Sequence, residues 1–131
     1  MDINNMWIED PLPPDCPPND AIESDNGIYY RLVDTFPPTL EDFYSQKKKY
    51  PNKNFYVNFS ECIQKSCSIF STYKSCDSVR KAFKSHRNQK IVKIVLSSSC
   101  GLIKRTGNTP NHYSWWIKTD FDPIPFCQEE V

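Results

Sequence analysis

Proline and glycine set the first limit on what this chain of 131 residues can fold into, because it contains eleven prolines and only three glycines. Five of the prolines fall between Pro11 and Pro18, where fixed φ angles and missing amide hydrogens disfavour both helix and central strand. Residues 1–26 are therefore expected to form an extended arm that ends at Gly27. Residues 27–131 are expected to form a single domain.

The same scarcity of glycine excludes two kinds of nucleotide-binding loop. With glycine only at positions 27, 101 and 107, the chain has neither a Walker loop nor a dinucleotide-binding fingerprint. The longest apolar stretch, residues 91–96, is interrupted by Lys93 and is too short for a membrane span. The first residues contain acids where a signal peptide would have its apolar core. We therefore expect a cytoplasmic protein with no membrane partner.

Segments rich in β-branched and aromatic residues outnumber those with helical spacing. The tail from residue 120, which contains two prolines, is expected to add at most a short edge strand. The expected strands are residues 28–33, 67–72, 90–97, 102–106 and 113–118.

Helical signals occur at two or three places. A hydroxyl followed three residues later by an acid begins at Thr39 and predicts a helix that continues to Tyr50. Ser75 is expected to cap a second helix, residues 60–66 are expected to form a helical turn, and residues 55–59 are open between strand and loop. The balance predicts an α+β domain with a mixed or mainly antiparallel sheet of about five strands and two or three helices.

The formal net charge of zero hides a separation of charge along the chain. Residues 1–42 hold ten acids and one base, residues 43–118 hold fifteen bases and two acids, and residues 119–131 hold four acids. A middle segment that basic is expected to attract an anionic partner, whether a nucleotide, a nucleic acid or an acidic protein. The alternative is that the acidic ends fold back over the basic middle.

The six cysteines allow either disulfides or a metal site. Their spacing lacks the close pairs of a zinc ribbon, and His86 and His112 are distant in sequence from any close cysteine pair. Because a cytoplasmic chain of this size keeps its thiols reduced, we expect the cysteines to be small buried hydrophobic residues and we expect no metal.

Two local patterns contain polar residues that suit a binding site. Arg31 follows Tyr30 in an aromatic strand and is open between an exposed position, a pair with Asp34, and a cleft in which its guanidinium would bind a phosphate or carboxylate. Ser68 and Ser71 lie on opposite faces of a strand that leads into a helix. Hydroxyls there either bind a sugar or phosphate or only cap the helix.

A third pattern is the aromatic strand that His112 begins. A histidine at this place is either an ordinary turn residue, a general acid or base, or a partner for a ribose hydroxyl. Trp115 and Trp116 offer a stacking surface for a nucleobase or nicotinamide ring, and because neighbours in a strand face opposite ways, we expect at most one of them in the core. No residue has the sequence signature of a nucleophile.

The order of these segments resembles that of a group of small bacterial proteins. The resemblance covers roughly residues 28–118, and its distant counterpart is the ADP-ribosyltransferase-like fold. The shared segments are Tyr-Arg-Leu-Val at 30–33, Pro-Pro-Thr-Leu-Glu-Asp-Phe at 37–43, Ser-x-Phe-x-Thr at 68–72 and His-x-Ser-x-Trp at 112–116.

The resemblance to the ADP-ribosyltransferase-like fold implies a role for each candidate residue. Arg31 would contact the phosphates or ribose of NAD, Ser68 or Ser71 would support the nicotinamide ribose, and His112 would stand in for the acid that usually activates the ribose. Residues 128–130 have the Gln-x-Glu form, but only one residue follows them here. The resemblance thus implies an NAD- or nucleotide-binding transferase, with Arg31 and His112 as catalytic residues, of the kind found among bacterial toxins and defence effectors. Its cofactor-binding set would be Arg31, Ser68, Ser71, Tyr30 and Trp116.

Two other functions are open from the sequence. A non-catalytic module that binds nucleic acid or protein would use the basic face of residues 43–118. A structural partner in a larger complex would need no chemistry at all. The nucleotide hypothesis differs from both because it expects Arg31, the serines and His112 to meet in one cleft lined by a Trp or Tyr.

Overall fold

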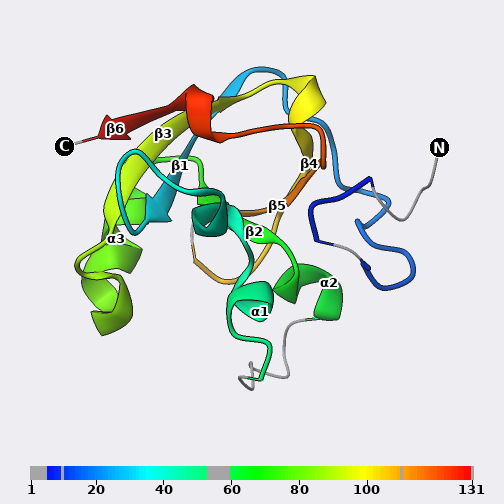
Figure 1. Ribbon diagram of the computed structural model, residues 1–131, viewed down its shortest axis with the longest axis horizontal. Coiled ribbons are helices and arrows are strands. Elements are labelled where there is room, and N and C mark those ends of the chain that lie inside the picture. The colour runs from blue at the N-terminus through cyan, green and yellow to red at the C-terminus, as the bar shows by residue number, and fades with distance from the viewer. Residues whose placement is uncertain (1–5, 10, 53–59, 110, 131) are drawn as a thin grey trace.

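Six segments pair into one antiparallel sheet in the computed structural model, which describes residues 6–9, 11–52, 60–109 and 111–130 (Figure 1). The order across the sheet is β4-β5-β2-β1-β3-β6. The expected α+β fold with a mainly antiparallel sheet is confirmed, with six strands rather than five because the acidic tail pairs with β3. The strands are β1 Gly27–Val33, β2 Cys67–Phe70, β3 Lys90–Leu96, β4 Gly101–Arg105, β5 His112–Ile117 and β6 Cys127–Glu130.

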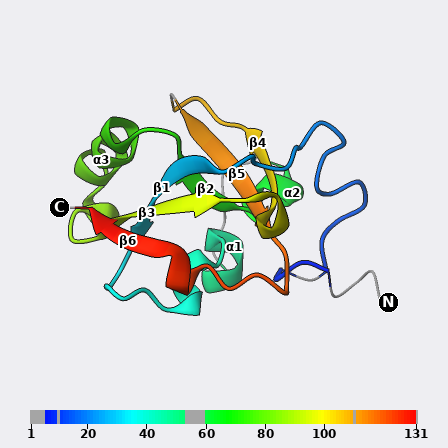
Figure 2. The ribbon, with the colours of Figure 1, turned by 90° about the horizontal axis from the view of Figure 1, so that it is seen from above.

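The described residues include three short α-helices, and Figure 2 shows α3 set apart from α1 and α2. They are α1 Gln46–Lys49, α2 Glu61–Gln64 and α3 Tyr73–Ala82. The cap of α3 is Thr72, not Ser75 as expected, and its hydroxyl accepts the amide hydrogen of Ser75. The capping hydroxyl therefore lies three residues earlier, directly after β2.

The prediction of a single helix from Thr39 to Tyr50 is wrong, because extended backbone interrupts the helix in the middle. Leu40–Phe43 form a 3-10 helix whose start has the expected capping box with Asp42. The chain then becomes extended at Tyr44 before Ser45 caps α1. Residues 55–59, which were open between strand and loop, lie outside the described residues.

The two faces of the sheet bury different clusters. One face packs against Phe43 of the 3-10 helix, and the other packs against Cys76 of α3, with Leu32, Phe70 and Ile91 beneath it. The sheet residues of the first face are Cys67, Ile69, Ile94, Leu96, Ile103, Trp115 and Ile117.

The junction between β1 and β2 is the weak line of the sheet. Only Tyr30 and Phe70 pair across it, whereas β1 pairs with β3 along seven residues. Beyond that single pair the two strands diverge, which separates the group β4-β5-β2 from the group β1-β3-β6. Backbone groups freed at this divergence need other partners.

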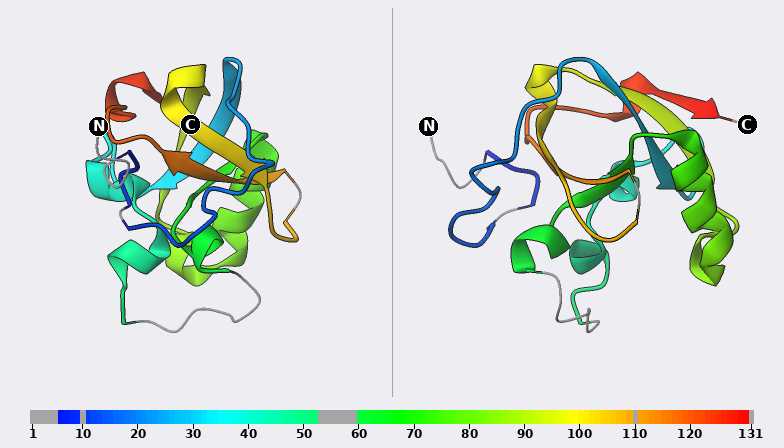
Figure 3. Two further views of the ribbon diagram at one scale, coloured as in Figure 1. Left: turned by 90° about the vertical axis from the view of Figure 1, so that its right-hand side faces the viewer. Right: turned by 180° about the vertical axis from the view of Figure 1, so that it is seen from behind.

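The N-terminal arm runs along the outside of β4 and β5, as Figure 3 shows from two sides. Trp7 bridges to Lys118, and Ile22 bridges to Ile103. The arm covers the second face of β5, so Trp115 and Trp116 are both buried and the expectation that at most one lies in the core is wrong.

A disulfide between Cys16 and Cys62 ties the arm to α2, with the two Cα atoms 5.6 Å apart. The expectation that all six cysteines are reduced is therefore wrong for this pair. Spacing in the sequence gave no signal, because 46 residues separate the two positions. Among the described helices, none combines the length and the apolar character needed to cross a membrane.

Candidate functional site

A cavity of about 410 Å³ opens where β1 and β2 diverge, a size within the range of roughly 300–1,000 Å³ that is typical of small-molecule sites. Its lining residues come from β1, β2 and β5, from α1, α2 and the end of α3, and from segments next to them. Its lining contains no acidic residue in the described part of the chain. The lining consists of Arg31, Leu32, Tyr44, Ser45, Gln46, Lys49, Ile63, Gln64, Ser66, Ser68, Phe70, Val79, Phe83, His86, Gln89, Thr109 and His112.

Arg31 is the buried cation of this cavity, with 8% of its surface exposed. Its Nε and Nη2 donate to the carbonyl of Asp42 at 3.0 and 2.7 Å, and its Nη1 donates to the carbonyl of Ser68 at 2.6 Å. The second of these carbonyls lies on β2 where pairing with β1 has ended. Arg31 thus closes the divergence between the two strands.

No carboxylate within the described residues lies at ion-pair distance from Arg31. The carboxylate of Asp42 is turned away, since it accepts the amide hydrogens of Asp34 and Thr39, each at 2.9 Å. A guanidinium has five N–H donors and cannot lose its charge, and three donors are used here. The side chain therefore places a positive charge that has no carboxylate partner at the cavity wall.

His112 and Ser68 meet beside Arg31, although 44 residues separate them in sequence. His112 Nε2 lies 3.0 Å from Ser68 Oγ, and His112 Nδ1 lies 2.9 Å from the carbonyl oxygen of Thr106. A carbonyl only accepts, so Nδ1 carries the ring hydrogen and the neutral ring presents Nε2 as an acceptor. Ser68 Oγ then donates to Nε2.

The tight turn between β4 and β5 holds the histidine in this position. Gly107 adopts a φ of +74°, which disfavours any residue with a side chain, and the amide of Thr106 donates to the carbonyl of His112. Burial lowers the pKa of His112, and the nearby charge of Arg31 lowers it further, while the bond to Thr106 opposes the shift. The ring is therefore neutral at pH 7.

Three of the candidate residues from the sequence come together in the cavity, and three do not. Arg31, Ser68 and His112 line it, with Tyr44 as the aromatic wall. The others do not line it: Ser71, Tyr30, which packs edge-on against Tyr73, and Trp116, which is buried under the arm.

The sequence missed the residues that α1, α2 and the end of α3 bring to the cavity. Lys49 adds a second basic side chain, and Phe83 adds an aromatic ring that is 56% exposed. His86 lines the same wall, with Nδ1 at 2.6 Å from Gln89 Oε1. The sequence did not show that these residues meet, because no local pattern indicates that the three helices face one cavity.

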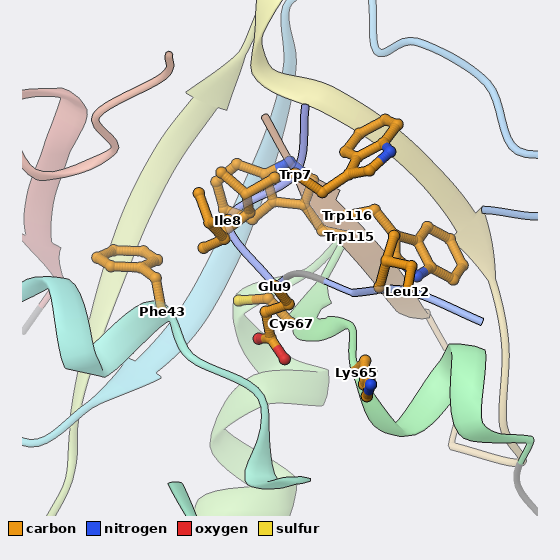
Figure 4. Close-up of a pocket in the computed structure, with 10 residues that line it drawn as sticks. Trp7, Ile8, Glu9, Leu12, Phe43, Lys65, Cys67, Trp115 and Trp116 are labelled. Atoms are coloured by element: carbon orange, nitrogen blue, oxygen red, sulfur yellow. The ribbon is translucent and has the colours of Figure 1, made fainter. Parts of the chain in front are cut away.

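A much smaller pocket lies between the arm and β5 (Figure 4). Its volume is about 10 Å³, close to the space of one water molecule. Glu9 extends from the arm into this region, where its carboxylate accepts the amide and hydroxyl hydrogens of Ser45 at 2.7 and 2.5 Å. Burial raises the pKa of Glu9, while these bonds oppose the rise.

The cysteines and the histidines offer no other reactive centre. Burial raises the pKa of Cys67 to about 11 and that of Cys76 to about 12, so both are neutral thiols at pH 7 and poor nucleophiles. Within the described ranges no group of three His, Cys, Asp or Glu side chains is placed to hold a metal ion.

The acidic ends of the chain pair with part of its basic middle. Lys104 lies 2.9 Å from Asp20 of the arm, and two lysines of β3 pair with the acids of β6: Lys90 with Glu129 at 3.3 Å and Lys93 with Glu130 at 3.5 Å. The charge separation along the sequence is therefore partly closed in space. The cavity keeps its positive charge because these pairs lie elsewhere.

Comparison with known proteins gives no match, whether with family models, with curated proteins or with solved structures. The geometry and charge of the cavity are therefore what indicates its function.

Proposed function

We propose that this protein binds a phosphate-bearing small molecule of the nucleotide class in the cavity between β1 and β2. The observation that carries the proposal is Arg31, a buried guanidinium that faces an acid-free cavity without a carboxylate partner. A buried charge without a partner costs several kcal/mol unless a ligand or solvent compensates it. A phosphate oxygen accepts strong hydrogen bonds from those N–H groups of a guanidinium that the protein's own carbonyls leave free.

The rest of the cavity suits the other parts of a nucleotide. Ser68 Oγ, which donates its hydrogen to His112, can accept a hydrogen bond from a ribose hydroxyl, and Lys49 adds a second positive charge. Phe83 and Tyr44 supply aromatic surface on which a base stacks. NAD and mononucleotides share these groups, so both belong to the proposed class.

The resemblance to the ADP-ribosyltransferase-like fold supports the binding of a nucleotide. Arg31 on the first strand and Ser68 on the second are the residues that the resemblance assigns to the nucleotide. Transfer of ADP-ribose has weaker support, because Glu129 and Glu130 lie on the outer strand β6 and pair with lysines of β3. A cytoplasmic location agrees with a nucleotide ligand. The Cys16–Cys62 disulfide is evidence against a cytoplasmic location, because disulfides are typical of oxidising compartments.

Binding of nucleic acid through a basic face has less support. Three bases of that face, Lys90, Lys93 and Lys104, pair with the acidic ends of the chain. On α3, Arg80 and Lys81 pair with Asp77 of the same helix, and of the three lysines of α1 only Lys49 lines the cavity.

Titration calorimetry with AMP, ADP, NAD, inorganic phosphate and a short single-stranded oligonucleotide tests the proposal. We expect a nucleotide to bind at one site per chain, more tightly than inorganic phosphate. Arg31→Lys keeps the charge but loses the fork, so it should weaken binding roughly tenfold or more, since a hydrogen bond to a charged group contributes about 1.5–3 kcal/mol.

The matched control is Arg105→Lys, which changes an exposed arginine of β4 that does not line the cavity. It should leave the affinity unchanged. Equal losses in the two variants, or binding of the oligonucleotide alone, would contradict a nucleotide site at Arg31.

A further inference from the structure

Ser68, His112 and the carbonyl of Thr106 form a chain of hydrogen bonds that ends in the cavity. The Thr106 carbonyl orients the imidazole through Nδ1 at 2.9 Å, and Nε2 accepts from Ser68 Oγ at 3.0 Å. This is the arrangement of an activated nucleophile: a hydroxyl, a general base within hydrogen-bond reach, and a third group that fixes the base. Ser68 is exposed and lines the cavity, so its hydroxyl is accessible to a ligand.

Arg31 completes the arrangement with a positive charge. Its Nη1 donates to the backbone carbonyl of Ser68, so the guanidinium lies beside the backbone of this serine. A fixed cation near the reacting group stabilises the negative charge that develops on an oxygen during attack. The histidine, the serine and the arginine come from three different strands, and the turn at Gly107 holds the first of them.

We propose that Ser68 is a catalytic nucleophile, activated by His112, that attacks a phosphorus atom of an anionic phosphoanhydride held by Arg31. The bond from Ser68 Oγ to phosphorus forms while the bond from phosphorus to the leaving oxygen breaks. The proton of Ser68 passes to His112 Nε2 and from there to the leaving oxygen. Water then attacks the phosphoserine, gives one proton to His112, and Ser68 Oγ leaves and regains a proton, so the net reaction is hydrolysis.

Among the described residues, Ser66 and the buried thiols lack this arrangement. Ser66 also lines the cavity, but its hydroxyl donates to the carbonyl of Ile63 at 2.6 Å and it is buried. The thiols of Cys67 and Cys76 are buried, and the only other histidine, His86, contacts Gln89 instead of a hydroxyl.

The inference rests on the proposed phosphate site, and a probe without a nucleotide tests it separately. An alkyl fluorophosphonate places an electrophilic phosphorus in the cavity, where attack by Ser68 would release fluoride and leave a phosphonate ester. We expect one adduct per chain, located on the peptide of Ser68 by mass spectrometry. Ser68→Ala should abolish it, and His112→Gln should slow it by ~100-fold or more, the range of a general base.

Matched variants separate the nucleophile from its surroundings. Ser71→Ala removes a nearby hydroxyl that does not line the cavity and should leave the adduct and its rate unchanged. Circular dichroism checks that each variant is folded. An adduct on any other residue, or an equal rate in folded His112→Gln, would overturn the assignment.

The wild-type protein provides a test that needs no variant. The labelling rate should fall as the pH is lowered through the pKa of His112, which lies below the ordinary value of 6.5, because the protonated ring no longer accepts the hydrogen of Ser68. The other charged or titratable groups that line the cavity are Arg31, Lys49, Tyr44 and His86. His86→Gln should leave the profile unchanged, and a flat profile would overturn the role of His112.

The binding and labelling results also separate the two proposals. Nucleotide binding without labelling of Ser68 would overturn the nucleophile alone. Labelling of Ser68 in a protein that binds no nucleotide would overturn the proposed ligand class and leave the nucleophile. A nucleotide that binds and slows the labelling would support both.

Discussion

Glu9 and Arg31 are two buried charged side chains that this protein treats differently. They are almost equally hidden, at 7% and 8% exposure, and within the described residues neither has an oppositely charged partner at ion-pair distance. Glu9 lies beside a pocket with room for about one water, whereas Arg31 borders a cavity of about 410 Å³. The surroundings, not the depth of burial, distinguish them.

The chemistry of the two groups explains the difference. A carboxyl can relieve its burial by binding a proton, and the raised pKa of Glu9 is the sign of that. A guanidinium has no such route, because it stays charged at every pH at which proteins fold. Arg31 therefore needs an anion or solvent, and the acid-free cavity gives it access to one.

Removal of Arg31 should have the largest effect on stability. Arg31→Ala leaves the carbonyls of Asp42 and Ser68 without their donors, and we expect a loss of about 2–6 kcal/mol at roughly 1–3 kcal/mol for each. Urea unfolding measures it. The exposed Arg105→Ala should change stability by at most about 0.5 kcal/mol. If both variants unfold alike, Arg31 does not hold β1 and β2 together.

Loss of the Cys16–Cys62 disulfide should have the next largest effect on stability, because this disulfide holds the arm that contains Glu9. Serine at both positions removes a cross-link over 46 residues, and we expect a loss of about 2–4 kcal/mol. Thiol titration of the unfolded protein should count four free cysteines before reduction and six after it. A count of six without reductant would show that the arm is held by packing alone.

Glu9 should make a smaller contribution that depends on pH. Its folded pKa is raised, so the folded state binds this proton more tightly, and the associated stability is present below the unfolded value near 4.5 and is lost as the pH rises through the folded pKa. Glu9→Gln keeps an acceptor for the amide of Ser45 but does not titrate. The free energy of unfolding of the wild type should therefore rise relative to that of Glu9→Gln as the pH falls from 7 towards 4.5.

Urea unfolding of both proteins at several pH values measures this difference. Glu129→Gln on β6 is the matched control, because Glu129 is an acid whose partner Lys90 is half exposed. A gap between wild type and Glu9→Gln that stays constant with pH would mean that Glu9 keeps its charge at no cost.

The sequence predicted the strands better than the helices, for a physical reason. Runs such as residues 90–96 alternate or consist of β-branched residues, and such runs indicate a strand without knowledge of their neighbours. The helix expected from Thr39 breaks at Tyr44 because Ser45 bonds Glu9, which lies 36 residues away. The cap residues and acids of this helix were visible in the sequence, but the distant partner of Ser45 that interrupts the helix was not.

The candidate site shows the same limit. Arg31, Ser68 and His112 were identifiable as polar residues in or beside strands, and the sheet brings them together. Trp116 was misplaced because the strand alternation of β5 does not reveal that the arm covers its second face. The hydrogen bond between Ser68 and His112 depends on the pairing of β2 with β5, which no local signal predicts.

Ser71→Ala should have the smallest effect and tests how sharply the cavity is bounded. Ser71 was as good a candidate as Ser68 in the sequence, but it follows β2, does not line the cavity, and uses its backbone amide to bond the carbonyl of Asn111. Alanine keeps that amide, so nucleotide affinity should change by less than about twofold and stability by at most about 0.5 kcal/mol. Ser68→Ala removes a hydroxyl three residues away that His112 contacts, and calorimetry on the two variants compares them directly. A larger loss of affinity at Ser71 would place the ligand at the far end of β2, where the uncompensated charge of Arg31 could not be what binds it.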